Sequence, residues 1–223
     1  MSAVRIEPAS ASHFDDVQYA LSGGGDGRSC QCQWWMMRSS EWDGTTKAER
    51  QERLRSEMHA DLAPGLVLYV DDVAAGFVRV GPRATHVRLA HSRKIAPLST
   101  QSWEDPDVWT VSCFVVRREF RSLGLTALLL DEAIEYSRSH GARAIEAYPV
   151  DVSGGKWRSN ELFHGTLATF IAAGFHEVAR PRPTHVMVLL DFSQTYPVPP
   201  TASSARPAGN MARGTTSPIW SST

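Results

Sequence analysis

A short basic turn carries the clearest chemical signal in the sequence. It reads RSLGLT, from Arg121 to Thr126, and it opens a helical stretch that extends to about residue 140. The first backbone N–H groups of a helix have no partner within the helix, so they can bind an anion such as a pyrophosphate. Gly124 leaves room for phosphate oxygens beside the main chain, and Arg121 adds a positive charge. An ordinary turn glycine beside a solvated arginine would give the same pattern.

The elements that must position this turn alternate between strand and helix. Residues 108–116 read VWTVSCFVV, with β-branched and aromatic side chains on both faces, which predicts a strand buried on both sides. The alternation favours an α/β fold with a layered sheet. Strands are predicted over residues 4–7, 66–70, 74–80, 108–116, 144–148, 176–179 and 186–190, and helices over residues 12–21, 46–62, 126–140 and 160–173.

The composition is that of a globular protein without a dominant charge. Of the 223 residues, 42% are hydrophobic and 21% are charged, and 23 Lys and Arg side chains nearly balance 24 Asp and Glu. Such a balance gives no overall field for nucleic acid or an anionic membrane, and no apolar run approaches the ~20 residues that span a bilayer. The start lacks the pattern of a secretory signal. We therefore expect a cytoplasmic protein without nucleic-acid or membrane partners.

We predict one domain over residues 1–192 and a flexible tail over residues 193–223. The tail contains five prolines and eleven Ser or Thr residues, and it has neither an acidic residue nor a helical or strand periodicity. Its few apolar side chains are too scattered to offset the entropy lost on ordering the chain.

The region around the basic turn resembles a known enzyme family, the GNAT superfamily of N-acetyltransferases. The family signature is Arg or Gln, two residues, Gly, one residue, and Gly or Ala; Arg121 and Gly124 match it, with Thr126 at the last position. A later helix that ends in Gly174-Phe175 is a second family feature. The resemblance covers about residues 4–190. The sequence looks most like a bacterial branch of the family whose acetyl acceptors are undefined. It implies a mixed central sheet with splayed parallel strands, flanked by helices.

The resemblance also implies that acetyl-CoA binds as a co-substrate. The main chain of residues 114–116 would pair with the pantetheine arm, and the amides of residues 122–126 would hold the pyrophosphate. The acetyl group would lie where the strands over residues 108–116 and 144–148 separate. The expected coenzyme-binding residues are therefore Phe114, Val115, Val116, Arg121, Ser122, Leu123, Gly124, Leu125 and Thr126.

Three positions differ from the family pattern. Thr126 stands where the family has Gly or Ala, and its Cβ would crowd a phosphate although its hydroxyl could donate to one. Phe170 stands where many members have a tyrosine that protonates the departing thiolate. The glutamate that other members place near the start of the motif strand has no match in residues 109–112. Coenzyme binding is therefore better supported than any assignment of the acid and the base.

Proton transfer needs a base if the acceptor is an amine of pKa ~10.4, because its neutral form at pH 7 costs about 4.6 kcal/mol. Asp107, before the motif strand, and Glu146, inside the next strand, are the candidates. A charged Glu146 in a central strand is expensive unless it is paired or faces a wet cleft, so an ion pair with Arg143 or Arg158 is the alternative. Tyr148 lies on the same face as Glu146 and is either the missing proton donor or a packing residue.

The segment CQCQWW supplies the remaining candidates. Trp34 and Trp35 either wall the acceptor pocket or fill the core. Cys30 and Cys32 lack the second Cys pair that a structural zinc site needs, so we expect no metal. Cys113 has no histidine beside it in the sequence, which favours packing over a role as nucleophile. An odd number of cysteines also argues against a disulfide framework.

With the resemblance, these features predict an N-acetyltransferase that moves acetyl from acetyl-CoA to a primary amine by direct attack in a ternary complex. Main-chain N–H groups of the motif strand would stabilise the thioester oxygen. The acceptor would be an amine of a small molecule or a protein, and a homodimer is compatible with the sequence. Two alternatives stay open: a CoA-binding sensor or scaffold without catalysis, and a nucleotide-phosphate binder unrelated to acyl transfer.

Overall fold

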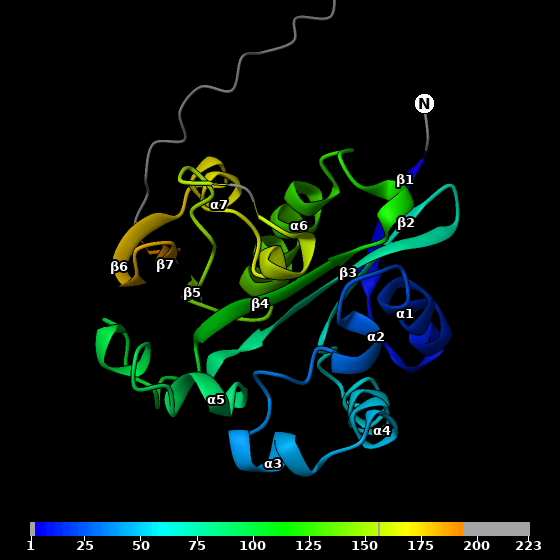
Figure 1. Ribbon diagram of the computed structural model, residues 1–223, viewed down its shortest axis with the longest axis horizontal. Helices are drawn as coiled ribbons and strands as arrows, with labels where there is room; N and C mark the ends of the chain where they lie inside the picture. The colour runs from blue at the N-terminus through cyan, green and yellow to red at the C-terminus, as the bar shows by residue number, and fades with distance from the viewer. Residues whose placement is uncertain (1–2, 156, 194–223) are drawn as a thin grey trace, which may run out of the picture.

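Seven strands form one mixed sheet in the computed structural model, which describes residues 3–155 and 157–193 (Figure 1). In the spatial order β1-β2-β3-β4-β5-β7-β6, β4 and β5 run parallel and the other neighbours run antiparallel. The strands are β1 (Val4–Pro8), β2 (Gly65–Val70), β3 (Val73–Pro82), β4 (Val108–Val116), β5 (Ala144–Ala147), β6 (His176–Arg182) and β7 (His185–Asp191). The predicted α/β fold with a mixed sheet is confirmed. The predicted tail lies outside the described residues apart from Ser193.

Helices cover both faces of this sheet. α6 packs on β2, β3 and β4 from one face, and α1 packs on the same strands from the other (Figure 1). The α-helices are α1 (Phe14–Leu21), α2 (Gly27–Cys30), α3 (Ser39–Gly44), α4 (Lys47–Glu57), α5 (Val87–Ala90), α6 (Leu125–Ser139) and α7 (Leu167–Ala172). Short 3-10 helices cover Ala11–His13, Arg83–Thr85, Ala96–Leu98, Arg118–Phe120 and Ser159–Leu162.

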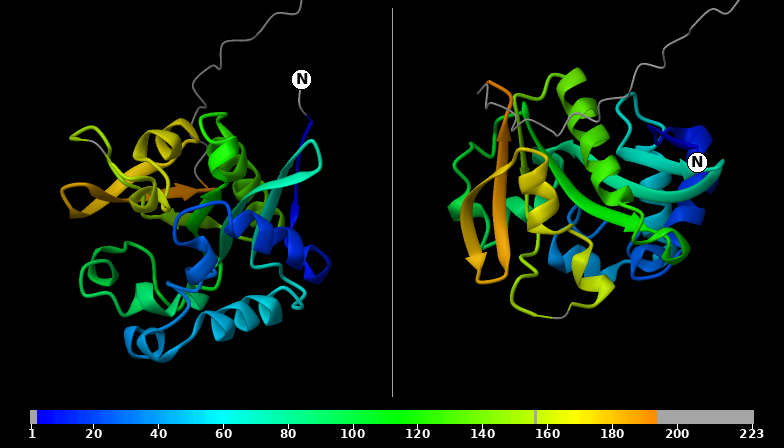
Figure 2. Two further views of the ribbon diagram at one scale, coloured as in Figure 1. Left: turned by 45° about the vertical axis from the view of Figure 1, so that its right-hand side comes forward. Right: turned by 90° about the horizontal axis from the view of Figure 1, so that it is seen from above.

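Two hydrophobic cores follow from the alternation of side chains along the strands. Leu68 and Val78 face α6, whereas their neighbours Val67 and Phe77 face α1 and α4. The strands β2 and β3 are joined by Asp71 and Asp72, which both have positive φ angles, of 46° and 64°. Two such residues make the tight turn whose twist suits a hairpin. Figure 2 shows the β6–β7 hairpin at one edge of the sheet and β1 at the other.

The helix predicted over residues 160–173 is wrong in its first half. The chain forms a single 3-10 turn over Ser159–Leu162, and α7 begins only at Leu167. Gly165 has a φ of +76°, which ends any helix that precedes it, and the Thr166 hydroxyl accepts the Thr169 N–H to cap α7. The segment between the two helices is therefore free to run beside β4.

Replacing Gly65 with alanine should destabilise the sheet. A Cβ at Gly65 would lie 2.1 Å from the carbonyl oxygen of Val78 and 2.8 Å from the ring of Phe77. The backbone cannot retreat without breaking the β2–β3 pairing, so we expect the free energy of unfolding to fall by about 1–3 kcal/mol or more. Urea denaturation measures this as a lower midpoint. Gly81→Ala is the matched control, because a Cβ there meets nothing within 4 Å. Equal losses in both variants would contradict the explanation.

Candidate functional site

The parallel strands β4 and β5 separate after a short paired stretch. Their register runs from Val108 opposite Ala144 to Val111 opposite Ala147. β4 then continues to Val116 without β5 beside it, while it stays paired with β3 on its other edge. A bulge follows at once, because Arg79 and Val80 of β3 pair with Cys113 and Val111, which leaves Ser112 as the extra residue. The predicted splay of the two strands therefore begins at this bulge.

The bulge changes which side chains of β4 face which core. Val111 and Phe114 both pack in the core beneath α6, although they are three residues apart. Cys113 and Val115 face the core formed with α1 and α4. An uninterrupted strand would place Val111 and Phe114 on opposite faces. The extra residue therefore reverses the face to which each following side chain of β4 points.

Two histidines hold the bulged residue from different sides. The Oγ atom of Ser112 lies 3.0 Å from Nε2 of His86, and its carbonyl oxygen accepts the Nδ1–H of His164 at 3.1 Å. Burial lowers the pKa of both histidines to about 3, and Arg79 contributes in the case of His86. Both rings are therefore neutral at pH 7 and act as fixed hydrogen-bonding partners.

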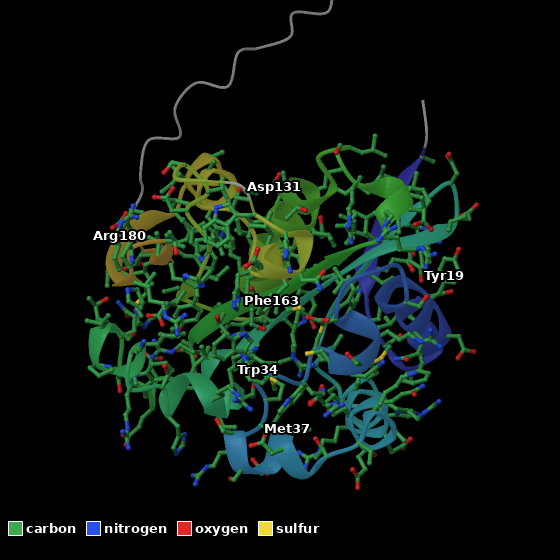
Figure 3. The ribbon with its side chains drawn as sticks, in the orientation of Figure 1. Tyr19, Trp34, Met37, Asp131, Phe163 and Arg180 are labelled. Carbon is green, nitrogen blue, oxygen red and sulfur yellow. The ribbon has the colours of Figure 1, made fainter. Side chains whose placement is uncertain are left out.

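The edge of β4 beyond the bulge is open to other partners. Because the Arg117 N–H donates to Ala75 in β3 at 2.9 Å, the main-chain groups of Phe114 and Val116 face the opposite edge. The Phe114 N–H donates to the Phe163 carbonyl at 2.7 Å, and Phe163 lies over the middle of β4 (Figure 3). The Val116 carbonyl accepts Nε of Arg121 at 3.1 Å. No sequence pattern indicated that the Phe163 carbonyl takes up a donor on this edge.

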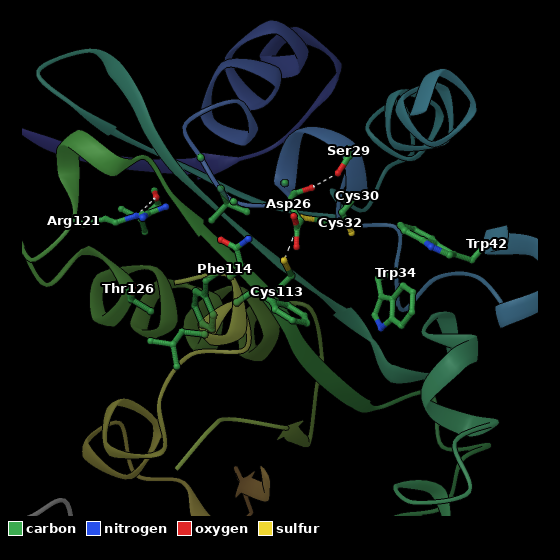
Figure 4. A pocket seen from close by; sticks show the side chains of 18 residues that line it. Asp26, Ser29, Cys30, Cys32, Trp34, Trp42, Cys113, Phe114, Arg121 and Thr126 are labelled. Carbon is green, nitrogen blue, oxygen red and sulfur yellow. Dashed lines mark hydrogen bonds between the residues drawn. The ribbon is translucent and has the colours of Figure 1, made fainter. Parts of the chain in front are cut away.

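A cavity of about 580 Å³ runs along this edge (Figure 4). Arg121 and Thr126 line one end, and residues 113–116 line the middle. The other end is lined by two thiols and two indole rings, those of Cys30, Cys32, Trp34 and Trp42. Residues from three separate parts of the chain therefore form one continuous wall: residues 24–42, β4 with the turn after it, and residues 160–163.

The basic turn has the geometry that exposes helix N–H groups. Gly124 has a φ of +74° and precedes α6, and no side chain caps the helix there. Ser122 also has a positive φ, of 64°, which bends the chain back towards β4. A Cβ at Gly124 would meet nothing within 4 Å, so the space beside it is open. The first amides of α6 are thus directed towards an open region, as an anion site requires.

The predicted coenzyme-binding residues gather at this cavity. Phe114, Val115, Val116, Arg121 and Thr126 line it. The remaining residues of the set, Ser122, Leu123, Gly124 and Leu125, form the turn between these lining residues, and the Leu123 side chain is exposed.

The two predicted tryptophans are separated. Trp34 lines the cavity, where its ring meets that of Trp42 edge to face at 5.0 Å and the Arg88 guanidinium lies 3.8 Å from its centroid. Trp35 points away from the cavity and packs against Tyr148 and His164. Trp34 therefore lies in the wall of the cavity, and Trp35 packs against a buried cluster.

Glu146 and Tyr148 lie in the interior and do not line the cavity. The Glu146 carboxylate is completely buried and accepts hydrogen bonds from Arg83 Nη1 at 3.0 Å, Ser99 Oγ at 2.6 Å and the Tyr148 hydroxyl. Burial and the Glu146 charge hold the pKa of Tyr148 well above its ordinary value. The ion pair considered for Glu146 exists, but its partner is Arg83 rather than Arg143 or Arg158.

The third predicted proton-transfer group is distant from the splayed edge. Asp107 is exposed and precedes β4 at the end where β4 still pairs with β5, and its carbonyl oxygen accepts the Arg143 N–H at 2.9 Å. The Arg143 side chain pairs with Asp105 instead. Among the residues that the structure describes, no contact connects the Asp107 side chain to the cavity.

The acidic residue that does line the cavity, Asp26, was not among the predicted site residues. Asp26 belongs to the glycine-rich segment GGGDG, and among the described residues it is the only carboxylate in the lining. The loop lies close to the turn after β4: a Cβ at Gly23 would be 2.3 Å from Arg117, and one at Gly24 would be 3.3 Å from Arg121. Four glycines around one acid were the available signal, since such a run allows close approach of the backbone.

Comparisons with known proteins agree with this geometry. The model of the acetyltransferase (GNAT) family matches residues 31–154, more than half of the chain, so the protein belongs to this family. Family membership makes it an acyltransferase, in a family whose acetyl donor is acetyl-CoA. No curated protein matches the chain by sequence.

Solved structures share the fold at low sequence identity. The GNAT domain of S. lividans PAT has a TM-score of 0.50 at 14% identity, with 84% of this chain and 90% of that chain covered. A GNAT-family acetyltransferase from Listeria monocytogenes also has a TM-score of 0.50, at 11% identity, with 84% and 94% covered. In the part of the chain that the structure describes, no helix could cross a membrane, and no three potential ligand side chains are grouped for a metal ion.

Removing the Glu146 carboxylate should cost stability. Glu146→Ala would leave the buried Arg83 charge without its partner, and breaking such a pair costs about 3–5 kcal/mol of unfolding free energy. Denaturant titration measures the loss. The control is Asp105→Asn, which breaks the partly exposed pair with Arg143 and should cost about 0–1 kcal/mol. The combined change of Arg83→Met and Glu146→Leu should recover part of the loss; a fully stable Glu146→Ala protein would contradict this account.

Proposed function

We propose that this protein is an acetyl-CoA-dependent N-acetyltransferase that acts on a primary amine by direct attack in a ternary complex. The observation that carries the proposal is the continuity of the cavity. It extends from the start of α6, along the open edge of β4, to a separate end that is lined by thiols and indole rings. A coenzyme and an acceptor can therefore lie end to end, with the reacting atoms meeting beside β4.

The coenzyme would use the main-chain groups that β4 leaves available. The Val116 N–H and the Phe114 carbonyl face the open edge and can pair with the amides of the pantetheine arm. The Phe114 N–H is already bonded to Phe163, so its pairing with the coenzyme or the thioester oxygen would require that bond to open. The amides of residues 122–126 would hold the pyrophosphate. Arg121, oriented by its bond to Val116, would add charge.

Proton transfer would take place at the acceptor end. The amine nitrogen attacks the thioester carbon, the C–S bond breaks, and the proton lost by nitrogen ends on the coenzyme thiolate. The predicted base Glu146 and the predicted proton donor Tyr148 are hydrogen-bonded to one another in the interior, and we assign them to positioning rather than to contact with substrate. Asp26 lines the cavity, is exposed to solvent, and can take up the proton of an ammonium acceptor.

The acceptor end favours an amine on an apolar or flat body. Its wall consists of the two indole rings and the thiols, and its single acidic residue among those described is Asp26. A compact ammonium beside Asp26 with its apolar part against Trp34 and Trp42 fits this lining. A polycationic acceptor would find one carboxylate only.

A CoA-binding sensor is the second candidate, and one observation favours it. Phe170, which stands where many relatives are expected to have a tyrosine, is completely buried and packs edge to face against Phe114 and Phe175. No hydroxyl is therefore supplied from that position to protonate a thiolate. The sensor would bind acetyl-CoA in the same cavity without transferring the acetyl group, so no free CoA would form.

Replacing Arg121 with alanine should weaken coenzyme binding. A hydrogen bond to a charged group contributes about 1.5–3 kcal/mol, so we expect CoA to bind roughly ten to a hundred times more weakly. Isothermal titration calorimetry with CoA measures the change. Arg118→Ala is the matched control, since Arg118 lies three residues before Arg121 in the same connection between β4 and α6 but is exposed and does not line the cavity. Equal effects of both substitutions would argue against a pyrophosphate at this turn.

Acceptor-dependent release of CoA tests the reaction itself. We expect acetyl-CoA to raise the melting temperature more than ATP does, and we expect arylalkylamines to be acetylated faster than polyamines or aminoglycosides. A thiol-reactive dye follows the released CoA, and mass spectrometry of the product identifies the acetylated nitrogen. Asp26→Asn should slow turnover while CoA binding is kept. Binding without turnover across the amine panel would favour the sensor, and a preference for ATP would point to a nucleotide-phosphate binder.

A further inference from the structure

Two thiols from different parts of the chain meet inside the cavity. The Cys32 thiol donates to Sγ of Cys113 at 3.4 Å, and both side chains are almost completely buried (Figure 4). Cys32 follows α2, and Cys113 follows the bulge of β4. We propose that Cys32 and Cys113 form a reversible disulfide, which makes this pair an oxidative modification site at the acceptor end of the cavity.

The backbone directly after α2 is bent in a way that aims Cys32 at β4. Gln31 and Cys32 have φ angles of 54° and 51°, in the left-handed region that residues other than glycine rarely adopt. Two such residues in succession persist only where the surroundings fix them. The buried side chain of Gln31 does so, because it accepts from Gln18 Nε2 at 2.7 Å and donates to the Arg28 carbonyl at 2.9 Å.

A second irregularity brings Cys113 to the same place. The extra residue Ser112 shifts the alternation of β4, so that Cys113 faces α1 and α4 rather than the core beneath α6. Without the bulge the thiol would point to the other side of the sheet. Two independent distortions, one on each partner, therefore converge on one sulfur–sulfur contact.

Formation of the bond requires only a small movement. A disulfide has an S–S distance of about 2.05 Å, so the sulfurs must approach by about 1.4 Å from their present separation. Both thiols line the cavity, which gives a small oxidant a path to them. Cys30 lines the same cavity two residues away, but among the described residues no hydrogen bond joins its sulfur to Cys32 or Cys113, and it provides an internal control.

The environment keeps the Cys32 thiol protonated at neutral pH. The hydrogen bond to Cys113 and burial raise the pKa of Cys32 well above its ordinary value, with Glu57 adding to the effect and Arg79 opposing it. Burial raises the pKa of Cys30 to about 11. Because the thiolate is the reactive form, oxidation should become faster as the pH rises.

The chemistry balances with a peroxide as the oxidant. One thiolate attacks the O–O bond to give a sulfenic acid and, after protonation, water. The second thiol displaces hydroxide from that sulfur, and a second water leaves. Two thiols and one peroxide thus become one disulfide and two waters, and a dithiol reverses the change. The bond would tie the segment that carries Trp34 to β4 and narrow the acceptor end.

Thiol counting and peptide mapping test the inference on the full chain without coenzyme. After hydrogen peroxide, the three free thiols should fall to one, the intact mass should drop by two hydrogens, and a non-reduced digest should contain the peptide pair joining Cys32 to Cys113. Cys30→Ser should form the same bridge. Cys113→Ser should form none, and its thermal melting curve confirms that the variant is folded.

Several results would overturn the inference. They are a bridge that includes Cys30, sulfinic acids without any bridge, or three thiols that stay free in peroxide while the urea-unfolded chain is oxidised in the same solution. Repeating the reaction with saturating acetyl-CoA, which has no free thiol to consume peroxide or to reduce the bridge, separates this inference from the proposed function. Slower formation of the disulfide supports a coenzyme bound in the cavity. An unchanged rate would leave the disulfide proposal standing and would contradict the proposed coenzyme site next to the two thiols.

Discussion

The end of the pairing between β4 and β5 is the constraint on which the site depends. A strand that loses its neighbour presents N–H and C=O groups that must find other partners, because unpaired buried polar groups are costly. In β4 these partners come from outside the sheet: Phe163 accepts the Phe114 N–H, and Arg121 donates to the Val116 carbonyl. The groups of this edge that face the cavity are thus few and fixed in direction, as an extended ligand such as a pantetheine arm requires.

A buried network closes the paired end of the same two strands. Glu146 lies opposite Thr110 in the β4–β5 ladder and is bonded to Arg83, which also stacks on Trp103 and donates to the carbonyls of residues 101 and 102. The long segment between β3 and β4 is thereby attached to the centre of the sheet. Because a buried ion pair contributes less to stability than to a unique arrangement, we interpret this network as the device that fixes where the strands part.

What the sequence revealed depended on how local each signal was. Two elements were predictable, the strand over residues 108–116 and the turn from Arg121 to Thr126. Their signals, a run of apolar residues and a helix start, each depend on only a few neighbouring residues. The partner of Glu146 was not, because Arg83 lies 63 residues away. The bulge at Ser112 depends on the register with β3, and the helix over residues 160–173 was interrupted by Gly165, whose positive φ no periodicity records.

The two ends of the cavity differ in the kind of backbone that forms them. The end at Arg121 is a short turn held between β4 and α6, two elements whose hydrogen bonds repeat. The end at Cys32 rests on a glycine-rich loop, a four-residue helix and two left-handed residues. Irregular backbone is held by specific side chains such as Gln31, so small changes there alter the shape of the pocket. An enzyme arranged in this way keeps one donor site while its acceptor site can change, because the two are stabilised by different interactions.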